Sequence, residues 1–252
     1  MTNRSGHPAT VKISRGTSPA LKESAGHPPI SRLVLHIGVT GHRPPRLSPD
    51  QFAVVKEAAG RVLVEIQKIL IQISRQTRGT FTDKPPLIRL ISSVAEGADS
   101  LLAQAALNLG LELQCPLPFP RVEYEQDFKT AESLVEYHRL LDSATTVLEL
   151  DGNRIDEGSA YLNAGTVMLD QSDLVIAVWD GAGPARSGGT AEIVAEAQLR
   201  DIPVLCIPPR DPASMRLLGK HAASAWQDLL RTWMEEFVKC HPPLKTPGVF
   251  AR

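Results

Sequence analysis

Three glycine-containing turns carry the polar residues of this sequence that are best suited to hold a ligand. They span residues 38–43, 92–97 and 181–190, and each follows an apolar run typical of a buried strand. Glycine lets a ligand approach the backbone closely, and a helix that starts after such a turn directs unpaired N–H groups at an anion. Arg43 and Thr190 add side-chain donors for a phosphate. Together the turns predict a site for a phosphate or a ribose.

The candidate ligand-binding residues lie in or directly beside these turns. Asp180 and Asp99 are candidate acceptors for ribose hydroxyls, but the first is also a common turn former and the second is also favoured in a first helical turn. His42 fits a ligand contact and a turn-stabilising role equally well. The set predicted to bind the ligand is Gly38, Thr40, Gly41, His42, Arg43, Ser92, Glu96, Gly97, Asp180, Gly188, Gly189 and Thr190.

Alternating strands and helices are needed to bring the turns together. The strands are expected at 33–39, 87–91, 111–115, 145–150, 174–179 and 203–207, and the helices at 48–73, 101–109, 123–141, 158–170, 191–199 and 223–238. Such an alternation requires right-handed crossovers and a parallel sheet. We therefore predict an α/β, Rossmann-like, doubly wound and mainly parallel sheet with helices on both faces, whose strand carboxyl ends share one edge.

Two segments leave alternatives open. The prolines of 116–120 are expected to end strand pairing and to form an exposed loop. Just beyond them, Tyr124 and Phe128 fit stacking on a base and packing in the core equally well. The apolar stripe of the last helix fits docking on the sheet or a dimer contact, and we favour docking.

The chain divides into three parts by composition. Residues 1–30 are rich in Ser, Gly and Pro, so we expect a flexible N-terminal tail. Residues 31–210 are expected to form the nucleotide-binding domain. Residues 211–252 are expected to form a C-terminal helical extension.

Three motifs carry a resemblance to a known superfamily. Residues 37–43 (IGVTGHR) resemble the opening of the SLOG superfamily, which includes Lonely Guy-type proteins and the DNA-processing A proteins. Residues 92–99 (SSVAEGAD) are similar to the DNA-processing A segment that precedes a helix. Residues 187–192 (SGGTAE) are similar to the Gly-Thr-x-x-Glu signature of Lonely Guy phosphoribohydrolases. The resemblance covers residues 33–207 and implies a Rossmann-like fold and a nucleotide-derived ligand.

The resemblance also names one candidate catalytic residue, Glu192. In the glycosidase-type relatives the catalytic glutamate follows the threonine by three residues, whereas Glu192 follows Thr190 by two. One helical position rotates a side chain by about 100°. We therefore favour a sensor that binds a nucleotide derivative such as an NAD metabolite, a nucleoside phosphate or a cyclic nucleotide. The alternative is a hydrolase that cleaves the N-glycosidic bond of a nucleoside 5′-monophosphate with Glu192 as nucleophile or transition-state stabiliser.

The composition bears on partners and location. The net charge of −1 argues against nucleic acid as a partner, and no apolar run reaches the roughly 20 residues of a membrane span. Cys240 and His241 lack a second ligand pair, so we expect no metal site, and no motif points to a cofactor. Three cysteines and no apparent signal segment suggest a cytoplasmic protein. A homo-oligomer or an effector protein remains open as a protein partner.

Overall fold

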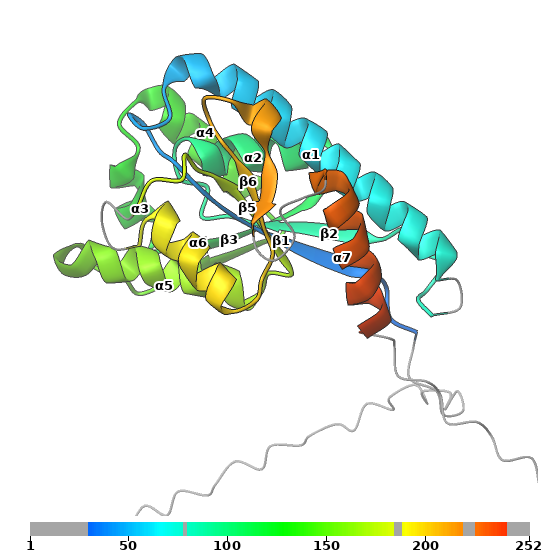
Figure 1. Cartoon of the computed structure of the whole chain (residues 1–252). Coiled ribbons are helices and arrows are strands. Elements are labelled where there is room, and N and C mark those ends of the chain that lie inside the picture. Colours follow the sequence, from blue (N-terminus) through cyan, green and yellow to red (C-terminus); the bar gives the residue numbers. More distant parts are fainter. Residues whose placement is uncertain (1–29, 78–79, 184–187, 219–224, 241–252) are drawn as a thin grey trace, which may run out of the picture. The chain divides into compact units, whose positions relative to one another are not determined.

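A seven-stranded sheet with helices on both faces forms the described part of the protein (Figure 1). The computed structural model describes residues 30–77, 80–183, 188–218 and 225–240. The strands run in the order β4-β3-β2-β1-β5-β6-β7, and every pair is parallel except β6 and β7. Their bounds are β1 Val34–Gly41, β2 Leu87–Ile91, β3 Glu112–Leu117, β4 Thr146–Glu149, β5 Leu174–Val178, β6 Val204–Ile207 and β7 Arg216–Leu218. The predicted Rossmann-like, mainly parallel fold is confirmed.

The helices divide between two hydrophobic cores, one on each face of the sheet. The α-helices are α1 Pro49–Gln76, α2 Ala98–Asn108, α3 Arg121–Tyr124, α4 Ala131–Asp142, α5 Glu157–Asp170, α6 Thr190–Leu199 and α7 Trp226–Cys240. Along β5, Ile176 packs in the core with α1 and α2, while Val175 and Ala177 pack in the core with α5 and α6. This alternation follows from the period of two in a strand, and both faces of β5 are therefore apolar.

The long first helix begins where its sequence predicts. Ser48 is the N-cap and Pro49 is the first helical residue, where a missing N–H costs nothing. The side chain of Gln51 accepts a hydrogen bond from the Ser48 N–H at 3.0 Å. The helix therefore starts directly after the loop that follows β1.

The predicted helix over 123–141 is wrong as a single element. The chain instead forms α3, a 3₁₀ turn over Glu125–Asp127, and then α4. Phe128 adopts an extended conformation, and the Thr130 side chain caps α4 by accepting from the Ser133 N–H at 3.1 Å. The break lets Asp127 face the carboxyl edge of the sheet.

The predicted exposed proline loop after the third strand is also wrong. Pro116 belongs to β3 and pairs with Leu148 of β4, while Leu117 and Phe119 are fully buried. The pairing of β3 with β2 ends at Gln114, so the missing N–H of Pro116 breaks no bond on that side.

The last helix docks on the same face as α1. Leu230, Met234 and Val238 are buried in the core that contains α1, and Arg231 donates to the side chain of Gln72 at 2.6 Å. The short strand β7, which the sequence did not reveal, joins β6 to this helix. Residues 1–29 lie outside the described residues, so the tail and the domain boundaries remain predictions. Within the described ranges, no helix is long and apolar enough to cross a membrane.

Candidate functional site

A cavity lies where the strand order reverses, between β1 and β5. The two strands are neighbours, but α1 and α6, which follow them, pack on opposite faces. The loops after such strands diverge and leave a crevice at the carboxyl edge. Here the crevice has a volume of about 310 Å3 and is lined by residues 39–46, 183 and 188–191, together with side chains from α2, α5 and α6.

Seven of the twelve predicted ligand-binding residues line this cavity. They are Thr40, Gly41, His42, Arg43, Gly188, Gly189 and Thr190. The second turn contributes through Ser93, which the sequence did not single out. All three turns therefore meet at the same edge of the sheet, as the parallel strand pairing requires.

The other five predicted residues do not line the cavity. They are Gly38, Ser92, Glu96, Gly97 and Asp180. A Cβ atom at Gly38 would collide with the sulfur of Met168 on α5. Gly97 has a φ of +101°, and a Cβ there would lie 2.7 Å from the His42 carbonyl oxygen. These two glycines allow the close packing that shapes the cavity wall.

Asp180 joins the loop after β5 to the loop after β1. Its carboxylate lies 2.9 Å from His42 Nε2 and 3.2 Å from Arg46 Nη2, and it accepts from the Ala182 N–H at 3.0 Å. Burial alone would raise the pKa of Asp180, but these hydrogen bonds and charges outweigh it and lower the pKa to about 2. Asp180 and His42 thus stabilise the two loops against each other.

A second carboxylate, Asp127, does not line the cavity itself but holds two residues that do, Arg43 and Tyr161. It accepts from Arg43 at 3.0 Å, from Arg154 at 2.7 Å and from the Tyr161 hydroxyl at 2.5 Å. Burial tends to raise the pKa of Asp127, but the hydrogen bonds from Tyr161 and Arg154 and the charge of Arg43 bring it below its usual value. The Arg43 guanidinium lies 4.8 Å above the Tyr161 ring. Arg43 is therefore fixed in place beside the cavity.

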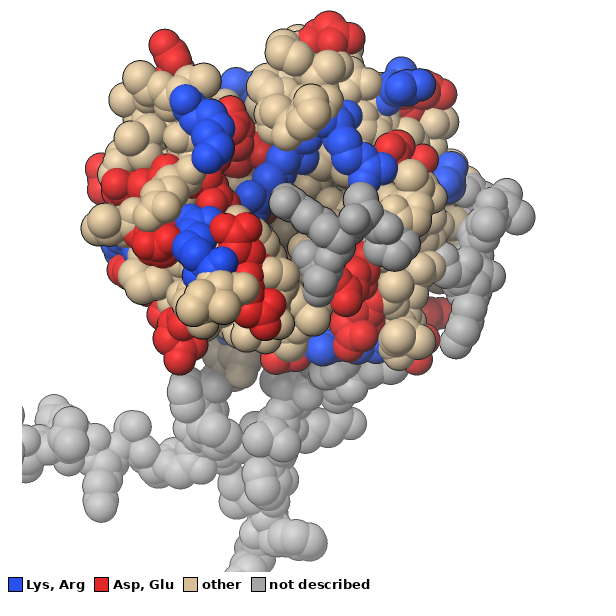
Figure 2. All heavy atoms as spheres, turned by 90° about the vertical axis from the view of Figure 1, so that its left-hand side faces the viewer, with Lys and Arg blue, Asp and Glu red and all other residues tan. Residues whose placement is uncertain are grey.

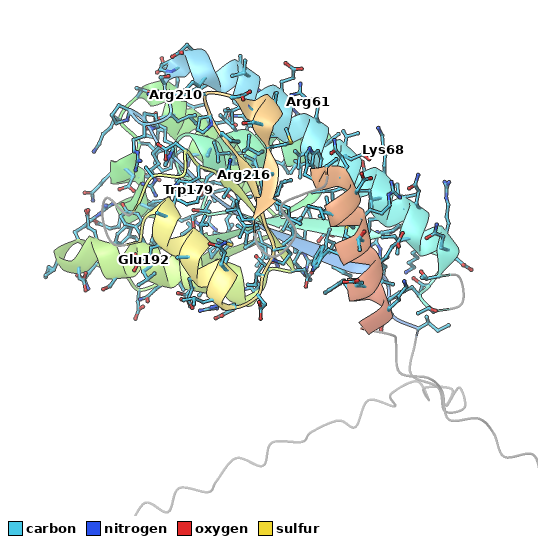
Figure 3. The ribbon with its side chains drawn as sticks, in the orientation of Figure 1. Arg61, Lys68, Trp179, Glu192, Arg210 and Arg216 are labelled. Atoms are coloured by element: carbon cyan, nitrogen blue, oxygen red, sulfur yellow. The ribbon has the colours of Figure 1, made fainter. Side chains whose placement is uncertain are left out.

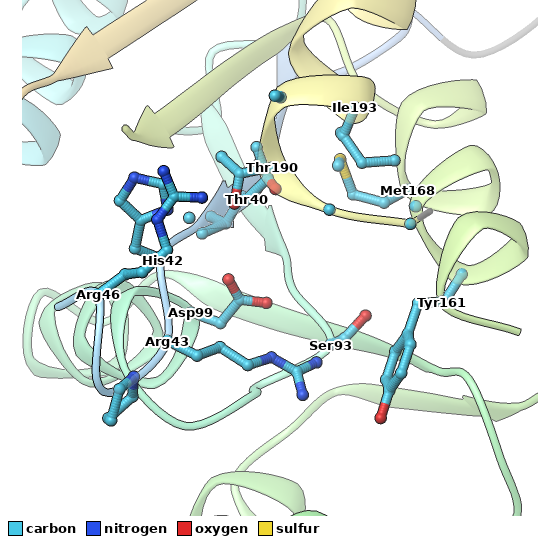
Figure 4. Close-up of a pocket in the computed structure, with 18 of the residues that line it drawn as sticks. Thr40, His42, Arg43, Arg46, Ser93, Asp99, Tyr161, Met168, Thr190 and Ile193 are labelled. Carbon is cyan, nitrogen blue, oxygen red and sulfur yellow. The ribbon is translucent and has the colours of Figure 1, made fainter. Parts of the chain in front are cut away.

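Asp99 is a buried carboxyl group in the cavity wall. It is 8% exposed, and in Figure 4 its carboxylate points into the cavity between Arg43 and the pair Thr40 and Thr190. Burial raises the pKa of Asp99 to about 7, although the charge of Arg43 and hydrogen bonds from Ser92 and the Ala95 backbone lower it. A carboxyl group with such a pKa in a cavity is characteristic of functional sites.

The start of α6 faces the cavity with its backbone donors. Gly189 is the N-cap, and Thr190 and Ala191 are the first helical residues and both line the cavity. Among the described residues, the N–H groups of these two have no hydrogen-bond acceptor. The following Glu192 (Figure 3) does not line the cavity, because its carboxylate accepts from the Gly188 N–H at 2.6 Å.

Several site residues were missed because no turn motif marks them. Arg46, Tyr161 and Asp127 come from a loop, from α5 and from a 3₁₀ turn. In the sequence these residues stand among apolar and charged residues, a pattern that any amphipathic segment shows. Tyr124 and Phe128, by contrast, are buried among aromatic rings, with the Tyr124 and Phe128 centroids 5.5 Å apart, so they pack in the core.

The face on which the parallel strands end carries both signs of charge. Figure 2 shows Lys and Arg side chains near the centre of this face, interspersed with Asp and Glu. The cavity contributes Arg43 and Arg46 to the basic side chains.

No protein-family model and no curated protein matches the sequence. Solved structures that match include DNA processing protein A from Streptococcus pneumoniae, at 16% identity and a TM-score of 0.44, over 85% of this chain and 59% of that one. The same protein from Helicobacter pylori matches at 15% identity and a TM-score of 0.45, over 80% and 81% of the two chains. The molybdenum cofactor carrier protein from Chlamydomonas reinhardtii matches at 17% identity and a TM-score of 0.36, over 68% and 75%.

DNA processing A proteins are among the proteins that the sequence motifs resemble. Identities and TM-scores this low establish no ligand and no activity for this chain. The prediction that nucleic acid is an unlikely partner is wrong. The Helicobacter pylori protein binds single-stranded DNA, so the balanced net charge of this chain does not rule such a partner out.

Proposed function

We propose that this protein binds a nucleotide-type small molecule in the cavity between β1 and β5 and does not turn it over. The observation that carries the proposal is that one cavity contains a buried carboxyl group, Asp99, and backbone donors at the start of α6 that have no acceptor among the described residues. The donors suit an anion and the carboxyl group suits hydroxyl or amine donors. A phosphate joined to a sugar or a base has both.

The phosphate end of the ligand is assigned to α6 and the loop after β1. The N–H groups of Thr190 and Ala191 lie at the positive end of the dipole of α6, a position that favours anions. Arg46 lines the same cavity, and its ion pair with Asp180 lies at the surface, where both side chains are about 40% exposed. Such an exposed pair is weak, so Arg46 is free to turn towards a phosphate.

The size of the cavity favours a mononucleotide. Its volume of about 310 Å3 lies at the lower end of the roughly 300–1,000 Å3 typical of small-molecule sites. A nucleoside monophosphate or a cyclic nucleotide fits this range better than an intact dinucleotide.

The position of Glu192 supports binding without turnover. A carboxylate that cleaves an N-glycosidic bond must reach the anomeric carbon within the cavity. Glu192 instead caps the turn at Gly188 and stays outside the lining. This position of Glu192 argues against the hydrolase alternative.

Calorimetric titration with nucleoside mono- and diphosphates, cyclic nucleotides, NAD and ADP-ribose tests this function, with a single-stranded oligonucleotide in the same panel. We expect saturable 1:1 binding of at least one mononucleotide. Chromatography of the same mixtures after incubation should show no free base. Absence of binding across the panel overturns the proposal, and so does base release that Glu192→Gln abolishes.

Arg46→Ala is the variant that locates the binding. We expect this substitution to lower the affinity for the nucleotide by about tenfold, a loss typical of one charge-assisted hydrogen bond. Arg61→Ala is the matched control, because Arg61 lies on α1 outside this cavity and, within the described ranges, forms its ion pair with Glu57 at the surface. Equal affinity in the two variants would place the ligand elsewhere.

A further inference from the structure

Asp99 is the one carboxyl group among the described cavity-lining residues. It belongs to the first turn of α2 and is 8% exposed, so its side chain is almost fully removed from bulk water. In the described part of the chain it forms no ion pair. The nearest guanidinium, that of Arg43, is already paired with Asp127 at 3.0 Å.

A buried carboxylate with unused acceptor capacity needs donors from outside the protein. An ionised carboxylate has two oxygens and about four acceptor positions. The Ser92 hydroxyl donates to the main-chain oxygen of Asp99 at 3.5 Å, and the carboxylate faces the cavity (Figure 4). Two neighbouring donors on a ligand would fill two of these positions.

We propose that Asp99 determines ligand specificity by accepting two hydrogen bonds from donors on adjacent atoms of the nucleotide. This inference rests on the proposed function of the cavity. Two parts of a nucleotide have such a donor pair, namely the 2′,3′-diol of ribose and the N–H edge of guanine. A ligand that lacks one donor leaves a buried acceptor unpaired and binds much more weakly.

The same contact links ligand binding to pH. The pKa of Asp99 in the free protein is about 7, because burial penalises the charged form. Donors on the ligand bind only that charged form, so protonation below pH 7 weakens binding. Between pH 8 and pH 6 the charged fraction falls about tenfold, and the affinity should fall equally. Arg43, Tyr124 and Cys115 also interact with Asp99. None of the three titrates near pH 7, because the pKa values of Arg43 and Tyr124 lie above their usual values and burial raises the pKa of Cys115 to about 12.

Titration with matched nucleotides tests which ligand donors bind to Asp99. The panel is AMP and GMP, each in its ribo, 2′-deoxy and 3′-deoxy form. Recognition of the diol predicts a loss of at least tenfold for both deoxy forms of either base. Recognition of the guanine edge predicts at least tenfold preference for GMP and no effect of the sugar. Affinities within threefold across all six nucleotides would overturn the inference.

Asp99→Asn provides the second measurement, because it keeps the shape of the side chain and removes its charge. We expect at least tenfold weaker binding and loss of the pH dependence, apart from the titration of the ligand phosphate itself. Asp170→Asn, at an exposed position on α5, should behave as wild type. If wild type binds no nucleotide, the proposed function fails; if wild type binds and Asp99→Asn binds equally well, only this inference fails.

Discussion

Asp99, which lines the cavity, and Asp127, which holds two of the lining residues, have opposite electrostatic roles. Asp99 has a raised pKa because it is desolvated without an ion pair, whereas Asp127 has a lowered pKa because it is held by two arginines and a tyrosine. The first is a source of instability that a ligand can relieve. Asp127 stabilises the positions of residues that line the cavity for the ligand.

Asp99→Asn should therefore stabilise the protein increasingly as the pH rises. The folded pKa of about 7 lies above the usual 3.8, so the wild type loses stability between about pH 4 and pH 7 and does not regain it above. The unfolding free energy of the variant minus that of wild type should increase by about 2–3 kcal/mol from pH 5 to pH 8. Urea denaturation at both pH values measures this. A difference that does not change with pH, as expected for Asp170→Asn, would contradict it.

Asp127→Ala should destabilise the fold, because it leaves Arg43 and Arg154 without their shared partner. Both arginine side chains are about a quarter exposed, so the cost is below that of a fully buried pair, and we expect about 2 kcal/mol. Chemical denaturation compares this variant with Glu149→Ala, whose surface pair with Arg121 should cost less than about 1 kcal/mol. Equal losses in the two variants would argue against a stabilising role of Asp127.

At the scale of elements, the packing of α2 against the loop after β1 depends on Gly97. Its positive φ and the 2.7 Å approach to the His42 carbonyl oxygen leave no room for a side chain. Gly97→Ala should cost about 2 kcal/mol or more, from backbone strain together with the collision.

Gly110→Ala is the matched control for this variant. Gly110 also has a positive φ, +71°, but no atom lies within 4 Å of a Cβ placed there. It should cost only about 1 kcal/mol, the strain alone. If thermal denaturation shows equal losses for both glycines, the close contact at Gly97 contributes nothing.

The elements that follow regular patterns were predictable from the sequence, and those fixed by tertiary contacts were not. The apolar runs predicted β2 at its observed bounds and β1 and β5 to within two residues, because both faces of these strands are buried. The break at Phe128 and the three residues of β7 are too short to alter a periodicity. Their conformation depends on burial and on pairing with β6, which only the folded chain supplies.

The same distinction holds for the site. The turns after β1 and β5 were recognisable because glycines and helix starts carry local signals. Asp127 acquires its role only through Arg43, which is 84 residues away in the sequence. Tyr161 likewise reaches the cavity because α5 crosses the sheet beside β1. No local sequence pattern predicts contacts between residues so far apart in the chain.

For the whole molecule, we predict that the cavity does not depend on residues 1–29, because the described residues that line it lie between Val39 and Ile193. Residues 1–29, which lie outside the described part, contain few apolar residues that could add to a core. A chain that starts at Ile30 should melt within a few degrees of the full chain and bind nucleotides with the same affinity. A drop in the melting temperature of more than several degrees would show that the segment packs on the domain.

The central claim is that a nucleotide binds with its phosphate at the start of α6, and a pair of substitutions at Thr190 tests it most directly. Thr190→Pro removes a backbone N–H while the helix persists, because proline suits the first helical position and the preceding Gly189 is extended. Thr190→Val removes only the hydroxyl group. The measurement is calorimetric titration of each protein with a nucleoside monophosphate and with the nucleoside that lacks the phosphate.

In wild type we expect the monophosphate to bind at least about tenfold more tightly than the nucleoside, which corresponds to one to two charge-assisted hydrogen bonds. Thr190→Val should keep most of this difference, and Thr190→Pro should remove most of it without changing the affinity for the nucleoside. A monophosphate that binds Thr190→Pro as tightly as it binds wild type would contradict the account.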